Sequence, residues 1–242
     1  MSGPSRSRFS NLRITRGALV VAGLELGLSL IYLVSDQETR GLFAEWLVAT
    51  PYTVFERGRV WTLATSVFLQ LDFIALVLHM MVLWMFVPTL ERFWSTPRFY
   101  RFVAITSLVG TAAGCAFGYL IGDMFRPLAG LDPFIYAAIV AFGIVYARQP
   151  VQFFGVLPLT GRQLMYGILA FLLLSVVLQQ HWTTGVSYAA AMLAAAVMTS
   201  KRWSPTLVWK RWRIARARAR LTVMSGGKAK PTPPRDEHKW LN

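Results

Sequence analysis

The chain has 242 residues, of which 55% are hydrophobic and 15% are charged, and its mean hydropathy is +0.47. So little charge cannot cover the surface of a water-soluble domain of this length, which excludes that class and indicates a lipid bilayer as the solvent. The net charge of +14 does not indicate nucleic-acid binding, because four of the 25 Lys and Arg residues precede residue 17 and twelve follow Ser200. Basic residues gathered at the two ends of an apolar chain are typical of cytoplasmic termini.

Six apolar segments predict membrane-spanning helices. Barrel strands would instead be alternating segments of about ten residues. The first three segments satisfy the roughly 20 helical residues that a bilayer core requires, whereas the fourth and fifth are short, which is typical of spans that begin inside the protein. We therefore predict an all-α membrane domain over residues 17–200, after a basic cytoplasmic N-terminus at 1–16. The predicted spans are 17–35, 72–90, 100–121, 133–147, 163–179 and 184–200.

Glu25 lies near the middle of the first predicted span. An ionisable residue at that depth is by default a candidate for function. The predicted spans offer it no obvious cationic partner, so two roles remain open: contact with a helix of a partner protein, and packing in the neutral form.

A long outer loop at residues 36–67 follows the first span. Two short segments of the loop carry aromatic residues in an amphipathic pattern, which predicts helices lying in the outer interface. The expected anchors are Trp46, Tyr52 and Phe55.

Gly110, Gly114, Gly118 and Gly122 recur every four residues in the third span. This spacing places all four on one helical face, where a second helix can approach closely, so we assign them to helix packing or partner binding. Cys115 in the same span is the single cysteine, which excludes a disulfide framework and is typical of a small packing residue.

The C-terminal segment at residues 201–242 is basic and aromatic before it becomes rich in Gly and Pro. We predict a cytoplasmic tail, with an amphipathic helix on the anionic inner leaflet followed by disorder. The tail lacks a recognition motif, so no nucleic-acid partner is expected. The lipid-facing residues would be Trp209, Lys210, Arg211, Trp212, Arg213, Arg216, Arg218 and Arg220.

The distribution of charge predicts orientation. With the N-terminus in the cytoplasm, nine Lys and Arg residues outside the tail fall on the inner side and four on the outer side. This bias favours an integral membrane protein with both termini in the cytoplasm. The short loops and the absence of targeting signals favour a bacterial inner membrane.

Three stretches resemble the rhomboid family of intramembrane proteases. Gly58–Leu69 is similar to the family segment that leads from the outer loop into the second span, although Trp61 is followed by Thr62 where the family has Arg. Leu83–Trp94 and Arg98–Phe102 are similar to the end of the second span and the start of the third. The resemblance extends over residues 58–200 and implies a rhomboid-like bundle of six transmembrane helices.

The resemblance also implies that the catalytic residues are replaced. Asp132 stands where the family has its nucleophilic Ser, and Tyr188 stands near the position of the general base His. Ala75 and His79 fall on the positions of the two oxyanion stabilisers. Acyl transfer needs a nucleophile beside a base, and loss of one oxyanion donor alone costs about 10²–10³ in rate. The chain therefore resembles pseudorhomboids and, more distantly, derlins, which implies binding of transmembrane proteins without catalysis.

His79 and Asp132 each have two interpretations. Asp132 precedes Pro133, a pattern typical of a helix N-cap, but its carboxylate could also serve a hydrated site. His79 lies mid-span and is expected to bond toward Asp132 or Tyr188, either as a core residue or as a proton-linked or client-sensing site. No cofactor is expected, and His79, His181, His238 and Cys115 lie on different elements, so no metal site is predicted.

The leading hypothesis is a non-catalytic membrane protein that binds other transmembrane proteins as an adaptor, chaperone or accessory subunit of a complex. One alternative is a rhomboid-like hydrolase with an altered site, which requires Asp132 and His79 to meet within hydrogen-bond reach. A second alternative is a small transporter. Two features argue against it: the spans carry few ionisable groups, and they show no repeated pair of broken helices.

Overall fold

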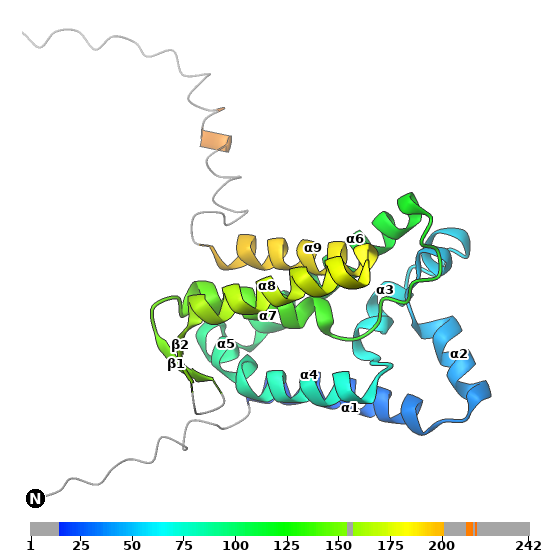
Figure 1. The fold of residues 1–242 in the computed structure, drawn as a ribbon, viewed down its shortest axis with the longest axis horizontal. Helices are drawn as coiled ribbons and strands as arrows, with labels where there is room; N and C mark the ends of the chain where they lie inside the picture. Colours follow the sequence, from blue (N-terminus) through cyan, green and yellow to red (C-terminus); the bar gives the residue numbers. More distant parts are fainter. Residues whose placement is uncertain (1–14, 154–156, 201–211, 215, 217–242) are drawn as a thin grey trace, which may run out of the picture. The chain divides into compact units, whose positions relative to one another are not determined.

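The structure is a computed structural model that describes residues 15–153, 157–200, 212–214 and 216. The chain divides into two compact units, residues 1–204 and 205–242. The described part of the first unit is helical apart from one short hairpin and an isolated bridge between Ala49 and Leu128 (Figure 1). Its elements are α1 (Arg16–Val34), α2 (Gln37–Leu47), η2 (Tyr52–Glu56), α3 (Thr62–Thr65), η3 (Ser66–Phe68), α4 (Phe73–Met85), α5 (Val87–Trp94), α6 (Thr96–Ile121), α7 (Asp132–Val145), β1 (Pro150–Phe153), β2 (Leu157–Thr160), α8 (Gly161–Gln179) and α9 (Trp182–Thr199).

The helices begin and end at residues that suit those positions. The side chain of Asp72 accepts a hydrogen bond from the amide of Ala75 at the start of α4, and Thr160 and Gln163 form a capping box at the start of α8. Gly122 ends α6 in the left-handed conformation, with φ of 79°. A Cβ atom there would contact nothing within 4 Å, so Gly122 does not pack closely against another helix of this chain, and its alternative role in partner binding stays a prediction.

The predicted second span is not one continuous helix. It is broken at Phe86 into α4 and α5, and Pro88 lies in the first turn of α5. Proline lacks the amide hydrogen that would continue the ladder, and its ring clashes with the carbonyl oxygen four residues earlier. The break therefore follows from Pro88.

The six predicted crossings are not confirmed. By length and composition, the described helices include three that could cross a bilayer, namely α1, α6 and α8, or four if the pair of Thr62–Phe68 and Phe73–Met85, bent by 82°, forms one span. With 14 residues, α7 extends only about 21 Å. With 18 residues, α9 has sufficient length, but its first turns carry polar Thr183, Thr184 and Ser187.

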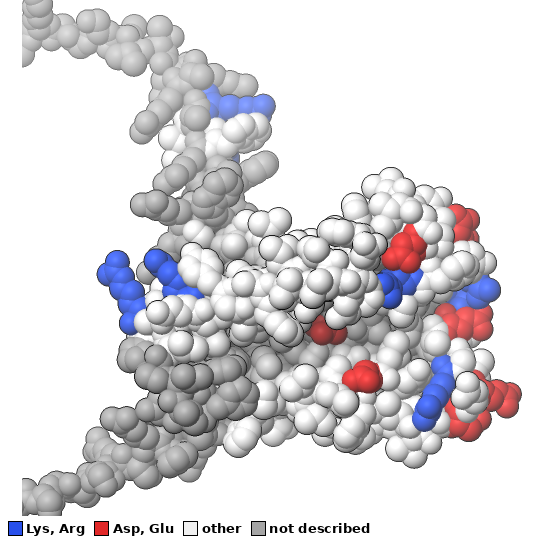
Figure 2. Space-filling view, viewed as in Figure 1, with Lys and Arg blue, Asp and Glu red and all other residues white. Residues whose placement is uncertain are grey.

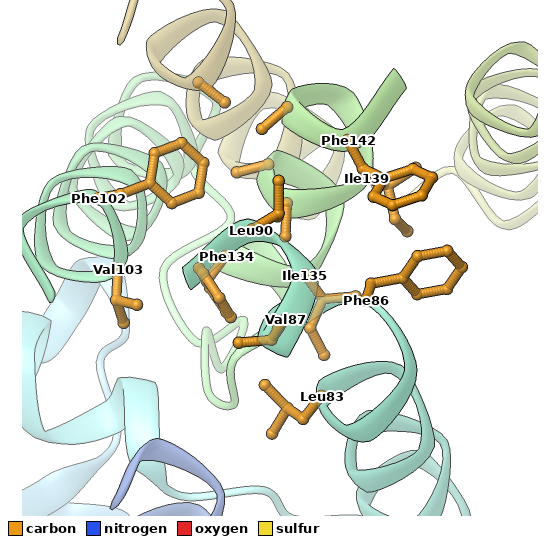
Figure 3. Packing of buried hydrophobic residues seen from close by; sticks show 14 of the residues in the cluster. Leu83, Phe86, Val87, Leu90, Phe102, Val103, Phe134, Ile135, Ile139 and Phe142 are labelled. Carbon is orange, nitrogen blue, oxygen red and sulfur yellow. The ribbon is translucent and has the colours of Figure 1, made fainter. Parts of the chain in front are cut away.

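The core lies where α7 meets its neighbours. Helix α7 contacts α4, α5, α6, α8 and α9, and most of its side chains are buried. Figure 3 shows Phe134 and Ile135 of α7 among Val87 and Leu90 of α5 and Phe102 of α6. Lipid is as apolar as these side chains, so close van der Waals packing holds them together. This central position explains how a short helix is retained in an apolar protein.

Three of the four predicted glycines lie between α6 and α9. A Cβ atom at Gly110 would lie 3.0 Å from the carbonyl oxygen of Ser187, and one at Gly114 would lie 3.2 Å from that of Thr183. A Cβ atom at Gly118 would lie 2.8 Å from Cγ2 of Thr183. This face therefore packs within the chain.

Glu91 holds the first turn of α1. Its carboxylate accepts hydrogen bonds from the amides of Gly17 and Ala18 at 3.0 and 2.8 Å, and from the hydroxyls of Thr15 and Thr96. Burial raises the pKa of Glu91, but these four donors outweigh that effect and leave the pKa below its ordinary value of 4.5. Glu91 thus joins the start of α1 to the junction between α5 and α6.

Charged side chains of the first unit gather toward the ends of the face seen in Figure 2, and the surface between is largely uncharged. Acidic side chains lie in the middle of this face, between the surface over α8 and that over α4. In the second unit, the described residues of the tail are helical, and the guanidinium of Arg216 lies 3.7 Å from the ring centre of Trp212. Trp209, Lys210, Arg211, Arg218, Arg220 and the predicted disordered end lie outside the described residues.

Candidate functional site

His79 lies between two carboxylates from two other helices. Its Nδ1 atom is 2.6 Å from Oε1 of Glu25 in α1, and its Nε2 atom is 3.1 Å from Oδ1 of Asp132 in α7. Glu25 is completely buried and His79 is 5% exposed, whereas the side chain of Asp132 is 24% exposed. The cluster therefore joins α1, α4 and α7, with one end open to the surface.

The number of protons in this cluster decides which of its hydrogen bonds can form. A neutral imidazole has a single N–H group, so both bonds form at once only if the ring is an imidazolium or one carboxyl carries a proton. A charge at this depth must be paired, because an isolated ion in an apolar medium is strongly disfavoured. The cluster is thus a site that holds a shared proton, and its bonds determine how three helices meet.

Asp132 does not act as the predicted helix cap. Leu131 occupies the N-cap position, Asp132 is the first residue of α7, and no side-chain capping bond forms there. The carboxylate instead faces His79 and lies 3.4 Å from Nε2 of Gln70. A carboxylate in the first turn still suits the partial positive charge of a helix N-terminus.

Glu25 has a hydrogen-bonding partner within the chain. His79 occupies the position facing it on α4, so the side chain of Glu25 does not reach a partner protein. The two residues are 54 positions apart. The available signal was that Glu25, His79 and Asp132 are ionisable groups in or at the edge of apolar segments, and such groups face one another inside a bundle.

Gln70 and Gly130 are buried beside Asp132, at the edge of the cluster. The backbone amide of Gln70 donates to Oγ of Ser29 at 2.8 Å, which fixes the turn between η3 and α4 against α1. Gly130 has φ of 87°, and a Cβ atom there would lie 2.7 Å from Nε2 of Gln70. A residue with a side chain would be strained at this φ, so the backbone conformation favours glycine here. Sequence reasoning missed both residues.

The other two degenerate positions form no hydrogen bond with the ring of His79. The amide of Ala75 bonds to Asp72 in the first turn of α4. The ring of Tyr188 packs 4.7 Å from that of Tyr136 and, with Ser187, lines a cavity of about 40 Å³ beside Pro133. Both hydrogen bonds of the His79 ring are to carboxylates, so no hydroxyl or thiol of the described residues pairs with it as a nucleophile.

No group of three or more His, Cys, Asp or Glu side chains converges to hold a metal ion within the described residues. Cys115 is a free, fully buried thiol beside Ala49, Val54 and Leu128. The candidate site is therefore the polar cluster of Glu25, His79 and Asp132.

The comparisons concern the chain as a whole. A family model described as "Eukaryotic integral membrane protein (DUF1751)" matches residues 18–203, a range that includes Glu25, His79 and Asp132. A comparison with curated proteins finds no match. The predicted bacterial inner membrane is wrong, because the family is eukaryotic, whereas an integral membrane location agrees with the family description. The match covers more than half of the sequence, and the chain belongs to the DUF1751 family of eukaryotic integral membrane proteins.

Proposed function

We propose that this protein is a non-catalytic, rhomboid-like membrane protein that binds other transmembrane proteins, as an adaptor, chaperone or accessory subunit. The observation that carries the proposal is the double engagement of His79 by Glu25 and Asp132. A general base must face a nucleophile, and here both ring nitrogens face carboxylates. The cluster serves to hold helices together in a lipid environment.

Exposed apolar side chains support an interaction with other helices. Phe171 and Leu178 of α8 are 69% and 73% exposed, and Ile74 of α4 is 69% exposed. Asp132 is partly exposed and contacts α4 through His79. A transmembrane segment beside α4 and α8 would meet an apolar surface with a polar group near it, and polar contacts help membrane helices associate.

Site-specific cross-linking tests the proposal. A photoreactive amino acid replaces Leu174 of α8 in the full-length protein, and the matched control replaces Leu42 of α2, since the two are 56% and 54% exposed. Mass spectrometry of the adducts should identify transmembrane proteins at position 174 and not at position 42. Adducts with lipid alone at position 174, together with a monomer after purification in mild detergent, would contradict the proposal.

An altered hydrolase is the second candidate. The observation in its favour is the 3.1 Å contact between His79 and Asp132, which is within the reach that acid–base chemistry requires. Purified protein is incubated with labelled transmembrane reporters, and His79→Ala and Asp132→Ala serve as controls. Cleavage by the wild type that both variants lose would favour the hydrolase over the adaptor.

A further inference from the structure

A groove on the surface of the first unit lies apart from the His79 cluster. It has a volume of about 190 Å³ and lies between α1, α3, η3 and α6, with Val20, Leu24, Ala64, Phe68, Ala104 and Leu108 among its lining residues. We call it the α1–α6 groove. Its lining is almost entirely apolar, and Val20 and Leu24 are 45% and 47% exposed. The groove is therefore accessible from the outer surface of the first unit.

Ser107 is a polar residue in this apolar lining. It is 1% exposed, and its hydroxyl oxygen has no hydrogen-bond partner among the described residues. The neighbouring hydroxyls of Thr106 and Thr111 bond to carbonyl oxygens one turn earlier, at 2.8 and 3.0 Å. A buried hydroxyl without a partner is costly, so Ser107 indicates a ligand that brings an acceptor oxygen.

One end of the α1–α6 groove is basic. The first turns of α1 and α6 lie together, because Gly17 and Thr96 bond to the same carboxylate oxygen of Glu91. Arg16 lies one turn before Val20 on α1, and Arg101 lies three residues before Ala104 on α6, so both extend the faces that form the groove. Both arginines are exposed, and neither forms an ion pair with a described residue.

The charge at the end of the groove favours a lipid over a helix as the bound group. The groove is open along one side, and an extended acyl chain can lie over its apolar lining. The two arginines supply the charge that complements a phosphate headgroup.

We propose that the α1–α6 groove binds one acyl chain of an anionic glycerophospholipid. The phosphate of the lipid lies against Arg16 and Arg101, and an ester oxygen accepts the hydrogen bond of Ser107. The site is independent of the proposed binding of transmembrane proteins, because it involves neither α8 nor the His79 cluster.

Native mass spectrometry of the full-length protein tests this site. Nanodiscs contain equal amounts of phosphatidylserine and phosphatidylcholine, and the retained lipid is counted after release. The wild type should retain one phosphatidylserine. Arg16→Gln and Arg101→Gln should each lower the preference over phosphatidylcholine about fivefold. Ser107→Ala should lower retention of both lipids by a similar factor, since it removes one hydrogen bond.

Two matched controls separate the groove from general effects. Ala104→Leu fills the groove and should abolish retention, whereas Ala116→Leu places the same side chain on an exposed site of α6 outside it. The double variant Arg148→Gln, Arg162→Gln removes two other exposed arginines and should leave the preference unchanged.

Several outcomes would overturn the proposal. Equal retention of the two lipids by the wild type excludes recognition of the headgroup. Loss of retention in the control variants excludes a local site. If free glycerophosphoserine displaces the lipid equally well from the wild type and from Ala104→Leu, the acyl chain is not the bound group. A transmembrane protein that copurifies and is lost in Ala104→Leu assigns the groove to a helix.

Discussion

The imidazole of His79 is bonded on both sides, so its removal affects two carboxylates at once. His79→Leu leaves the buried carboxyl group of Glu25 without its partner. Breaking a buried pair by removing one member costs about 3–5 kcal/mol. We expect a large fall in the thermal unfolding temperature of the protein in nanodiscs.

Two further variants test whether the loss of stability comes from the pair of Glu25 and His79. His181→Leu alters a histidine at the start of α9 and should change the unfolding temperature little. The double variant Glu25→Leu, His79→Leu removes both members of the buried pair and should be more stable than His79→Leu alone. If the double variant is the less stable of the two, the bond between Glu25 and His79 is not what stabilises this part of the protein.

Glu91 gives the protein a component of stability that depends on pH. Its pKa is lower in the folded protein than its ordinary value of 4.5, so the folded state binds protons less readily than the unfolded state. Stability from this group is complete above about pH 4.5 and is lost as the pH falls through the lower pKa of the folded state.

The variant Glu91→Gln tests this dependence through thermal unfolding measured between neutral and acidic pH. It should be less stable than the wild type at pH 7, and the difference should narrow below pH 4.5. The control is Glu38→Gln in α2, an exposed glutamate in the outer loop. A difference between Glu91→Gln and wild type that stays constant with pH would show that the carboxylate charge does not matter.

The contact between α6 and α9 depends on glycine at the element scale. Gly114→Ala would place a Cβ atom 2.7 Å from Leu128 and 3.2 Å from the carbonyl oxygen of Thr183, a backbone atom that cannot turn aside. Overpacking of this kind costs about 1–3 kcal/mol. The matched control is Gly27→Ala in α1, where a Cβ atom would meet nothing within 4 Å and should be neutral or stabilising.

The measurement is the unfolding temperature of both variants in the same lipid. Gly114→Ala should unfold earlier than the wild type, and Gly27→Ala should not. Equal unfolding temperatures for Gly114→Ala and the wild type would mean that α6 and α9 can separate without loss of stability.

Sequence patterns located the helices better than they located the contacts between them. Apolar runs and capping residues are local, so a helix starts within a residue or two of the predicted first, fifth and sixth spans. The pairing of Glu25 with His79 depends on how α1 and α4 rotate against each other, which a local pattern does not encode. The N-cap was misassigned to Asp132 because helix α7 begins one residue earlier than the Asp–Pro pattern indicates.

The number of crossings is a property of the whole molecule, and it determines where Arg148 lies. With six crossings, Leu42 and Arg148 are on opposite sides of the membrane. With four crossings formed by α1, the bent pair of α3 and α4, α6 and α8, both are on the outer side. Cysteine labelling with a membrane-impermeant maleimide distinguishes these topologies.

For this experiment, Leu42→Cys and Arg148→Cys are made separately, and Cys115 is fully buried and should not react. We expect labelling of Leu42→Cys from the outer side and labelling of Arg148→Cys only after permeabilisation, as six crossings require. Labelling of both variants in intact vesicles would establish four crossings instead. The tail should lie on the inner side in either case, since both numbers are even.

The bond between Glu25 and His79 also has a consequence for biogenesis. A ribosome adds about 5–20 residues per second, so the 54 positions between the two residues take roughly 3–10 s to synthesise. Asp132 follows another 53 positions later. During that time α1 enters the bilayer with an unpaired carboxyl group, at a cost of about 2.5–3.5 kcal/mol. Nascent chains that stop before residue 79 keep this defect, so the cell should degrade them faster than chains that extend beyond residue 132.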